Sequence, residues 1–325
     1  MNRRHAILAL AALGAPVRLI AQPVPGAPRI GLLLTGPSES SGHLVQAFVN
    51  GMAELGYQDG NNVRYELRHG DGSNEKTQQN ARELVAANVQ LIWAPSAPAV
   101  VATQKATMSL PIVFALVTDP VAFGIVRSLA RPGSNASGIS TMAAEMSAKR
   151  VEILHETFPK LKRVGVLHQP GDLASAAHLA IVQQGVRALG KELMVVEARA
   201  PEEFEAAIAK LAAWRADALI MLESTLFFAH RKTIFDSATK HRWVTINSTK
   251  EYAEAGAVIS YGADFSDNCR RSAAYVDRIL KGAKPADLPV QQPTKFEFVI
   301  NLKAAKAMGL SIPRAMLLRA DRVIE

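Results

Sequence analysis

The chain has 325 residues, of which 49% are hydrophobic and 20% charged, with a formal net charge of +8. This length allows two ordinary domains with sizeable cores, and this composition excludes a disordered chain. The positive charge does not indicate nucleic-acid binding, because lysines and arginines are scattered among acidic residues without a dense basic run. We therefore expect no nucleic-acid partner.

The first residues have the pattern of an export signal. Arg3 and Arg4 precede an apolar run over residues 6–13, and small residues follow. Such a run is too short to span a bilayer and is typical of a cleavable signal peptide, which we place at residues 1–21; the alternative is an amphipathic surface helix. Cys269, the only cysteine, lies far from the cleavage point and allows no intramolecular disulfide. We expect a periplasmic protein that is not a lipoprotein.

After a linker at residues 22–28, short apolar segments alternate with helical ones. The first half predicts strands at residues 29–34, 62–68, 89–94 and 110–117, with helices over about 41–57, 74–87 and 97–107 between them. Strands that are apolar along their whole length are typical of a parallel sheet covered by helices on both faces. The first half therefore predicts one α/β unit.

The same alternation repeats in the second half, across a join near residues 138–144. Helices are predicted over residues 146–158, 174–189, 201–214 and 226–241, and strands at 163–169, 191–198, 217–222, 243–247 and 256–262. A helix over about 265–281 and a further strand and helix follow. We predict two doubly wound α/β lobes, with lobe one formed by residues 29–141 and about 262–284, and lobe two by 142–261 and about 285–325.

Polar residues follow almost every predicted strand. In open α/β sheets, ligands bind beyond the carboxyl ends of the strands. Each such residue alone is explained as a helix N-cap, but together they predict a cleft for a small polar or zwitterionic molecule. The candidate ligand-binding residues are Thr35, Ser96, Ala97, Thr118, Asp119, Ser140, Thr141, His168, Asp172, Glu223, Ser224, Thr225, Asn247, Tyr261 and Asp264.

Enzyme signatures are missing from the sequence. The stretch GPSESSG has five residues between its glycines and lacks the lysine of a P-loop, and neither H-E-x-x-H nor G-x-S-x-G occurs. The eight histidines are dispersed, and no nucleophile is paired with a base. We predict a protein that is not an enzyme and has no cofactor and no metal site.

Long segments in both halves resemble one family. LPIVFALVTDPVAFGIVRSLARPGSNASGIST in the first half and EYAEAGAVISYGADFSDNCRR in the second resemble bacterial ABC-transporter substrate-binding proteins, a family that includes tryptophan/tyrosine-type binding components. The resemblance covers about residues 28–325. It implies a type I periplasmic-binding-protein fold, with two lobes joined by a three-strand hinge.

The resemblance also implies a function and partners. We expect a monomeric periplasmic protein that captures a small solute, such as an aromatic amino acid, between its lobes and delivers it to an ABC permease at the inner membrane. The alternative is a sensor subunit that reports solute occupancy to a membrane receptor. In either case Asp119 or Asp264 is expected to bind the ammonium group; the alternative for Asp119 is a cap for the segment after Pro120. Phe227 and Tyr261 are expected to form an apolar wall, unless Phe227 is a core residue.

Overall fold

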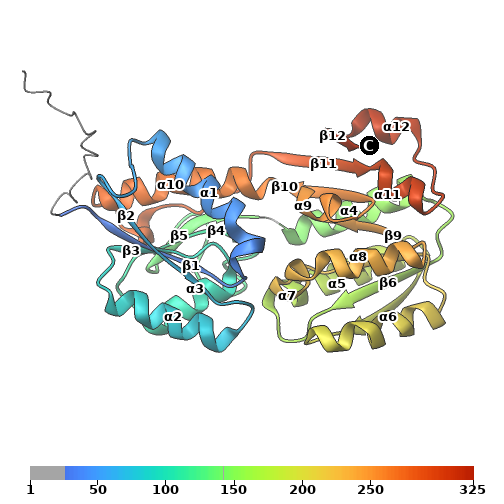
Figure 1. Cartoon of the computed structure of the whole chain (residues 1–325), viewed down its shortest axis with the longest axis horizontal. Coiled ribbons are helices and arrows are strands. Elements are labelled where there is room, and N and C mark those ends of the chain that lie inside the picture. The colour runs from blue at the N-terminus through green and yellow to red at the C-terminus, as the bar shows by residue number, and fades with distance from the viewer. Residues whose placement is uncertain (1–25, 142) are drawn as a thin grey trace, which may run out of the picture.

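The computed structural model describes residues 26–141 and 143–325, so the predicted signal peptide and most of the linker lie outside the described residues. Figure 1 shows two lobes side by side along the long axis of the molecule. Within these residues no helix is both long and apolar enough to cross a bilayer.

Lobe one is built on a five-stranded parallel sheet in the order β2-β1-β3-β4-β5. Helices cover both of its faces, so strands such as β1 are buried along nearly their whole length. Leu32 packs toward helices α1 and α10, whereas Leu33 packs toward α2 and α3. The elements are β1 (Arg29–Leu34), α1 (Ser38–Glu54), β2 (Arg64–His69), α2 (Asn74–Ala86), β3 (Leu91–Trp93), α3 (Ala97–Ala106), β4 (Ile112–Val117), β5 (Ala136–Ser140) and α10 (Phe265–Leu280).

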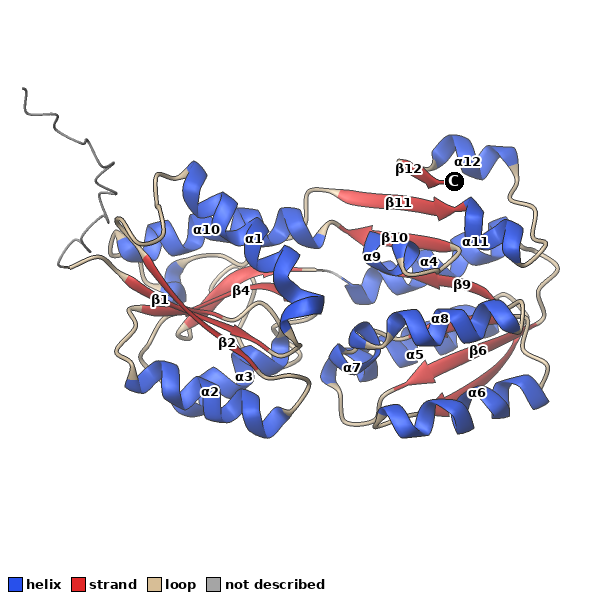
Figure 2. Cartoon of the chain, viewed as in Figure 1, coloured by secondary structure: helices blue, strands red, loops and turns tan. Residues whose placement is uncertain are grey.

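Lobe two is built on a seven-stranded sheet in the order β12-β11-β10-β9-β8-β6-β7. Its strands are parallel to their neighbours, except that β10 and β11 are antiparallel. Helices again lie on both faces (Figure 2). The strands are β6 (Arg163–His168), β7 (Glu192–Glu197), β8 (Ala218–Met221), β9 (Val244–Asn247), β10 (Ile259–Ala263), β11 (Phe296–Asn301) and β12 (Arg322–Ile324).

The helices of lobe two depart from the sequence prediction, which did not include those at Lys250–Glu254 and Arg314–Arg319. The single helix expected over residues 226–241 is divided into two at His230. The helices are α4 (Ala143–Thr157), α5 (Leu173–Ala188), α6 (Phe204–Ala213), α7 (Thr225–Ala229), α8 (Arg231–Lys240), α9 (Lys250–Glu254), α11 (Leu302–Ala307) and α12 (Arg314–Arg319), with short 3₁₀ helices at Pro201–Glu203 and Pro285–Asp287.

Three segments connect the lobes: one between β5 and α4, one between β10 and α10, and one at residues 291–296. The last of these lies later in the chain than predicted. Residues 285–291, which the sequence pattern assigned to lobe two, pack on lobe one: the Ser137 hydroxyl donates to the Leu288 carbonyl at 2.5 Å, and Gln291 forms a bridge with Ile139. Leu288 and Val290 are buried in the lobe-one core, so the chain leaves this lobe only after Gln291.

The strand order places a natural binding position in each lobe. In lobe one the order reverses between β1 and β3, and in lobe two it reverses between β6 and β8. The loops that follow strands on either side of such a switch point diverge and leave a crevice. Thr35 follows β1 and Thr225 follows β8, and their hydroxyl oxygens are 3.3 Å apart. The two crevices therefore open toward each other.

Candidate functional site

A cavity of about 140 Å³ lies between the lobes at these two switch points. Both lobes contribute to it, and its lining consists of apolar side chains, hydroxyl groups and two carboxylates. The lining residues are Leu34, Thr35, Gly36, Ser40, Ser41, Leu44, Pro95, Ser96, Ala97, Pro98, Leu116, Thr118 and Phe265 from lobe one, and Asp172, Glu223, Ser224, Thr225, Phe228 and Tyr252 from lobe two.

Hydroxyl groups from both lobes meet at the cavity. The Thr35 hydroxyl lies 3.4 Å from that of Ser96 and 3.3 Å from that of Thr225. Ser96 occupies the N-cap position of α3, yet its side chain makes no capping hydrogen bond. Because the first amides of a helix have no partner within the helix, Ser96 and Ala97 provide donors suited to an anionic group.

The two carboxylates both come from lobe two. Asp172 follows β6 and Glu223 follows β8, whereas no lysine, arginine or histidine is among the described residues that line the cavity. Asp172 also accepts a hydrogen bond from the Ser175 amide at 2.9 Å, as the N-cap of α5. The cavity therefore has a negatively charged side in lobe two and an uncharged hydroxyl side in lobe one.

Glu223 is held by an arginine behind the cavity wall. Arg150 donates to Glu223 Oε1 at 3.2 Å, to the Tyr261 carbonyl at 2.9 Å and to the Ser147 hydroxyl at 3.3 Å. Burial alone would raise the pKa of Glu223, but His178, at 3.6 Å, and Arg150 lower it below its ordinary value. Glu223 is therefore ionised and fixed in orientation at neutral pH.

Aromatic side chains form the apolar side of the cavity. Phe228 and Tyr252 pack edge to face with ring centroids 5.4 Å apart, and Phe265 lines the cavity from lobe one. Burial raises the pKa of the Tyr252 phenol, so this group stays protonated. Leu44 and Leu116 complete the apolar lining. This combination of flat and branched apolar groups suits an apolar or aromatic ligand group.

The structure brings part of the predicted residue set together. The predicted residues that line the cavity are Thr35, Ser96, Ala97, Thr118, Asp172, Glu223, Ser224 and Thr225. The lining also includes residues that the sequence pattern did not predict: the aromatic residues Phe228, Tyr252 and Phe265. The hydroxyls of Ser40 and Ser41 on α1 were likewise not predicted, and both donate to the Pro37 carbonyl.

Asp119, one of the two carboxylates expected to bind an ammonium group, does not line the cavity. Its Oδ1 accepts hydrogen bonds from the Val121 amide at 3.1 Å and the Ala122 amide at 2.9 Å. In the structure Asp119 therefore caps the segment after Pro120, which is the second of the two roles considered for it from the sequence.

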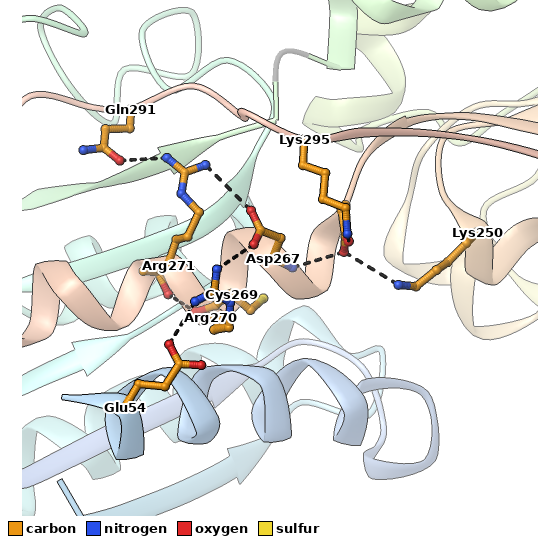
Figure 3. Close-up of polar contacts among 10 residues, drawn as sticks. Glu54, Lys250, Asp267, Cys269, Arg270, Arg271, Gln291 and Lys295 are labelled. Atoms are coloured by element: carbon orange, nitrogen blue, oxygen red, sulfur yellow. Dashed lines mark hydrogen bonds and ion pairs between the residues drawn. The ribbon is translucent and has the colours of Figure 1, made fainter. Parts of the chain in front are cut away.

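Asp264, the other expected ammonium ligand, lies at the hinge. It caps α10 through a 3.1 Å bond from the Asp267 amide and pairs with Lys295 at 2.9 Å and Lys250 at 3.7 Å. Figure 3 shows both lysines reaching toward the start of α10. Burial raises the pKa of Asp264, but these hydrogen bonds and charges lower it overall. Asp264 does not line the cavity, and its charged partners lie at the hinge.

The remaining predicted residues also lie outside the cavity lining. The Tyr261 ring packs against Phe296 and Phe298, and the expected wall residue Phe227 is fully buried in the lobe-two core. His168 Nδ1 contacts the Ser175 hydroxyl at 2.8 Å, and the Asn247 side chain donates to the Met221 carbonyl at 2.8 Å. At the first hinge segment, the Ser140 and Thr141 amides donate to the carbonyls of Gln291 and Val117, which fixes the chain there.

Comparison with known proteins identifies the family. A model of the ABC transporter substrate binding protein family matches residues 16–324. A tyrosine-binding protein from Clostridioides difficile strain R20291 is 26% identical over 279 residues, which cover 85% of this chain and 80% of that protein.

Solved structures agree with this result. A conserved domain protein from Vibrio cholerae O1 biovar El Tor strain N16961 has 26% identity and a TM-score of 0.86, over 91% of this chain and 99% of that one. An ABC domain from Streptococcus pneumonia in complex with L-Trp has 25% identity and a TM-score of 0.85, with the same coverage. The predicted two-lobed type I periplasmic-binding-protein fold and the family resemblance are thus confirmed, and the chain belongs to the ABC transporter substrate binding protein family.

Proposed function

We propose that the protein is the solute receptor of an ABC importer and that it captures an aromatic L-amino acid in the interlobe cavity. The observation that carries this proposal is the composition of the cavity, which places Phe228, Tyr252 and Phe265 beside hydroxyl groups and two carboxylates. The tyrosine-binding and L-Trp-bound relatives support the same class of ligand.

The distribution of charge sets the orientation of the ligand. The α-carboxylate of an amino acid binds at lobe one, where the Ser96 hydroxyl and the Ala97 amide at the start of α3 are donors. Its ammonium group binds at lobe two, between Asp172 and Glu223. A charge-assisted hydrogen bond of this kind contributes about 1.5–3 kcal/mol.

Because the two ligand charges are bound by different lobes, full affinity requires that the lobes close. The three crossing segments allow closure by a hinge motion. The receptor works in the periplasm, as predicted from its amino-terminal sequence, and passes its ligand to a membrane permease.

Thermal unfolding of the mature protein with added solutes tests the ligand class. L-Trp, L-Tyr and L-Phe are compared with L-Ala and with the corresponding arylpropionates, which lack the amino group. A ligand at 100 times its dissociation constant stabilises the protein by about 2.7 kcal/mol. We expect this stabilisation with at least one of the aromatic amino acids, and with neither L-Ala nor the arylpropionates. A shift caused by the arylpropionates alone would contradict the ammonium site, and turnover of the solute would contradict the receptor function.

Charge-removing variants then locate the ammonium site. We expect Asp172→Asn, which can still cap α5, and Glu223→Gln to weaken binding of the amino acid by roughly tenfold or more. Asp119→Asn is the matched control, since Asp119 caps a turn outside the cavity. Isothermal titration gives the affinities, and equal affinities for all three variants and the wild type would refute the assignment.

A further inference from the structure

A second, much smaller cavity lies in the core of lobe two, behind the wall of the interlobe cavity. Its volume is about 10 Å³, which is at the lower limit for holding one water molecule. Among the described residues, Glu223 is the one that lines both cavities. The polar lining of the small cavity also includes Arg150, His178, Asn247 and Ser248.

Three polar atoms of these lining residues have no hydrogen-bond partner within the part of the chain that the structure describes. They are His178 Nε2, Asn247 Oδ1 and Ser248 Oγ, on side chains that are at most 2% exposed. Buried polar atoms in folded proteins nearly always bond to the protein or to ordered water. The three atoms therefore need a partner that the described residues do not supply.

The hydrogen-bonding character of these atoms matches water. The Glu223 carboxylate, 3.6 Å from His178 Nε2, favours the tautomer in which this nitrogen carries the proton and donates. The side-chain nitrogen of Asn247 donates to a backbone carbonyl, so its Oδ1 is an acceptor, and the Ser248 hydroxyl can donate. A water molecule accepts from His178 and Ser248. It donates to Asn247 and to Glu223, which uses all four of its hydrogen-bonding positions.

We propose that this cavity binds a single water molecule, which bridges His178 to Glu223 and fixes the carboxylate that receives the ammonium group of the ligand. Arg150 bonds to Glu223 Oε1 at 3.2 Å, whereas the imidazole lies 3.6 Å from Oε2, which is too long for a direct hydrogen bond. A bond to one oxygen leaves the carboxylate plane able to turn, and a water bond to the other oxygen stops this rotation.

The water acts on the ligand only through Glu223. His178, Asn247 and Ser248 do not line the interlobe cavity, so they are positioning residues. The effect on ligand affinity therefore rests on the proposed function, whereas the water site itself depends only on the fold of lobe two.

A crystal structure of the mature protein without added ligand tests the water site directly. We expect a density peak in the small cavity, about 2.7–3.2 Å from His178 Nε2, Asn247 Oδ1 and Ser248 Oγ. A cavity without density, or an imidazole that bonds directly to Glu223, would refute the site whether or not an amino acid binds.

Calorimetric titration with the aromatic amino acid that gives the largest thermal shift tests the role of the water. Val182→Ile adds a methyl group to the cavity lining and displaces the water without removing a polar group, and Ser248→Ala removes one donor. We expect each to weaken binding roughly three- to tenfold. Val186→Ile is the control, because Val186 lies one turn further along α5 in the same core but outside the cavity lining, and it should bind like the wild type.

A double-mutant cycle with Glu223→Gln separates positioning from a general loss of structure. If the water acts through the carboxylate, neither Val182→Ile nor Ser248→Ala should weaken binding further in the Glu223→Gln protein. Equal effects with and without Glu223, or equal losses for Val182→Ile and Val186→Ile, would refute the positioning role while the proposed function stands. If no amino acid binds to the wild type, the proposed function fails, and the crystal structure still decides the water site.

Discussion

At the scale of single residues, Asp119 shows how a carboxylate at the end of a strand can be structural. Its oxygen bonds to two consecutive amides in the turn that begins at Pro120. We expect Asp119→Ala to lower the free energy of unfolding by about 1 kcal/mol, the usual cost of losing a cap, and to leave ligand affinity unchanged. Chemical denaturation and calorimetric titration of the same preparations measure both quantities, and a large loss of affinity without a loss of stability would reverse the assignment.

Polar site residues were easier to predict from the sequence than apolar ones. Thr35, Ser96 and Thr225 each end or follow an apolar strand, and in a parallel sheet such positions share one edge. Phe228 and Tyr252 lie on helices and resemble core residues, and only tertiary packing decides which aromatic faces the cavity. Phe227, next to Phe228, illustrates this, since it is buried in the core instead.

At the scale of elements, the contact between α1 and α10 depends on a residue without a side chain. A Cβ atom placed on Gly51 of α1 would lie 2.1 Å from the Arg270 carbonyl oxygen of α10. Such a distance is impossible without moving one helix. The close approach of these helices joins the N-terminal part of lobe one to the segment that returns from lobe two.

Alanine substitutions within α1 test this contact. We expect Gly51→Ala to destabilise the protein by about 1–3 kcal/mol through overpacking. Gly42 is the matched control, because it lies on the same helix and a Cβ atom there would meet no other atom within 4 Å. At Gly42 the substitution should stabilise the protein by about 0.5–1 kcal/mol through helix propensity alone. Similar thermal unfolding of the two variants would show that the helices can separate at little cost.

The sequence predicted the elements better than their connections. Continuous apolar strands can be recognised because both sheet faces are covered, and β1 and β4 therefore lie where expected. The antiparallel direction of β11 and the lobe-one position of residues 285–291 depend on where the chain crosses between lobes. No local pattern encodes that crossing, because Leu288 and Val290 would be equally apolar against either core.

At the scale of the whole molecule, a chain of polar contacts surrounds the hinge. Figure 3 shows Arg271 between Gln291 and Asp267, while Lys250 and Lys295 extend toward the start of α10. The lysines meet Asp264, which is 6% exposed and belongs to the second crossing segment. Lys295 lies on the adjacent crossing segment, whereas Lys250 begins α9 of lobe two. Of these two lysine contacts, only that of Lys250 joins the start of α10 to a helix of the other lobe.

We therefore expect Asp264→Asn to shift the ligand-free protein toward an open cleft. Asparagine still caps α10, but the two lysines lose their anionic partner. This loss changes the free-energy difference between the open and the closed cleft by about 0.5–1 kcal/mol, which corresponds to roughly a two- to fivefold change in ligand affinity. Because the pKa of Asp264 is lowered in the folded protein, its contribution is complete at neutral pH and is lost only as the pH falls below about 4, the ordinary aspartate range.

Small-angle scattering should show a larger radius of gyration for the Asp264→Asn variant. Asp277→Asn is the control, since Asp277 pairs with Lys281 and Tyr57 within lobe one, and it should leave the scattering unchanged. Equal scattering and affinity for Asp264→Asn and the wild type would show that the covalent geometry of the three crossings alone sets the lobe angle.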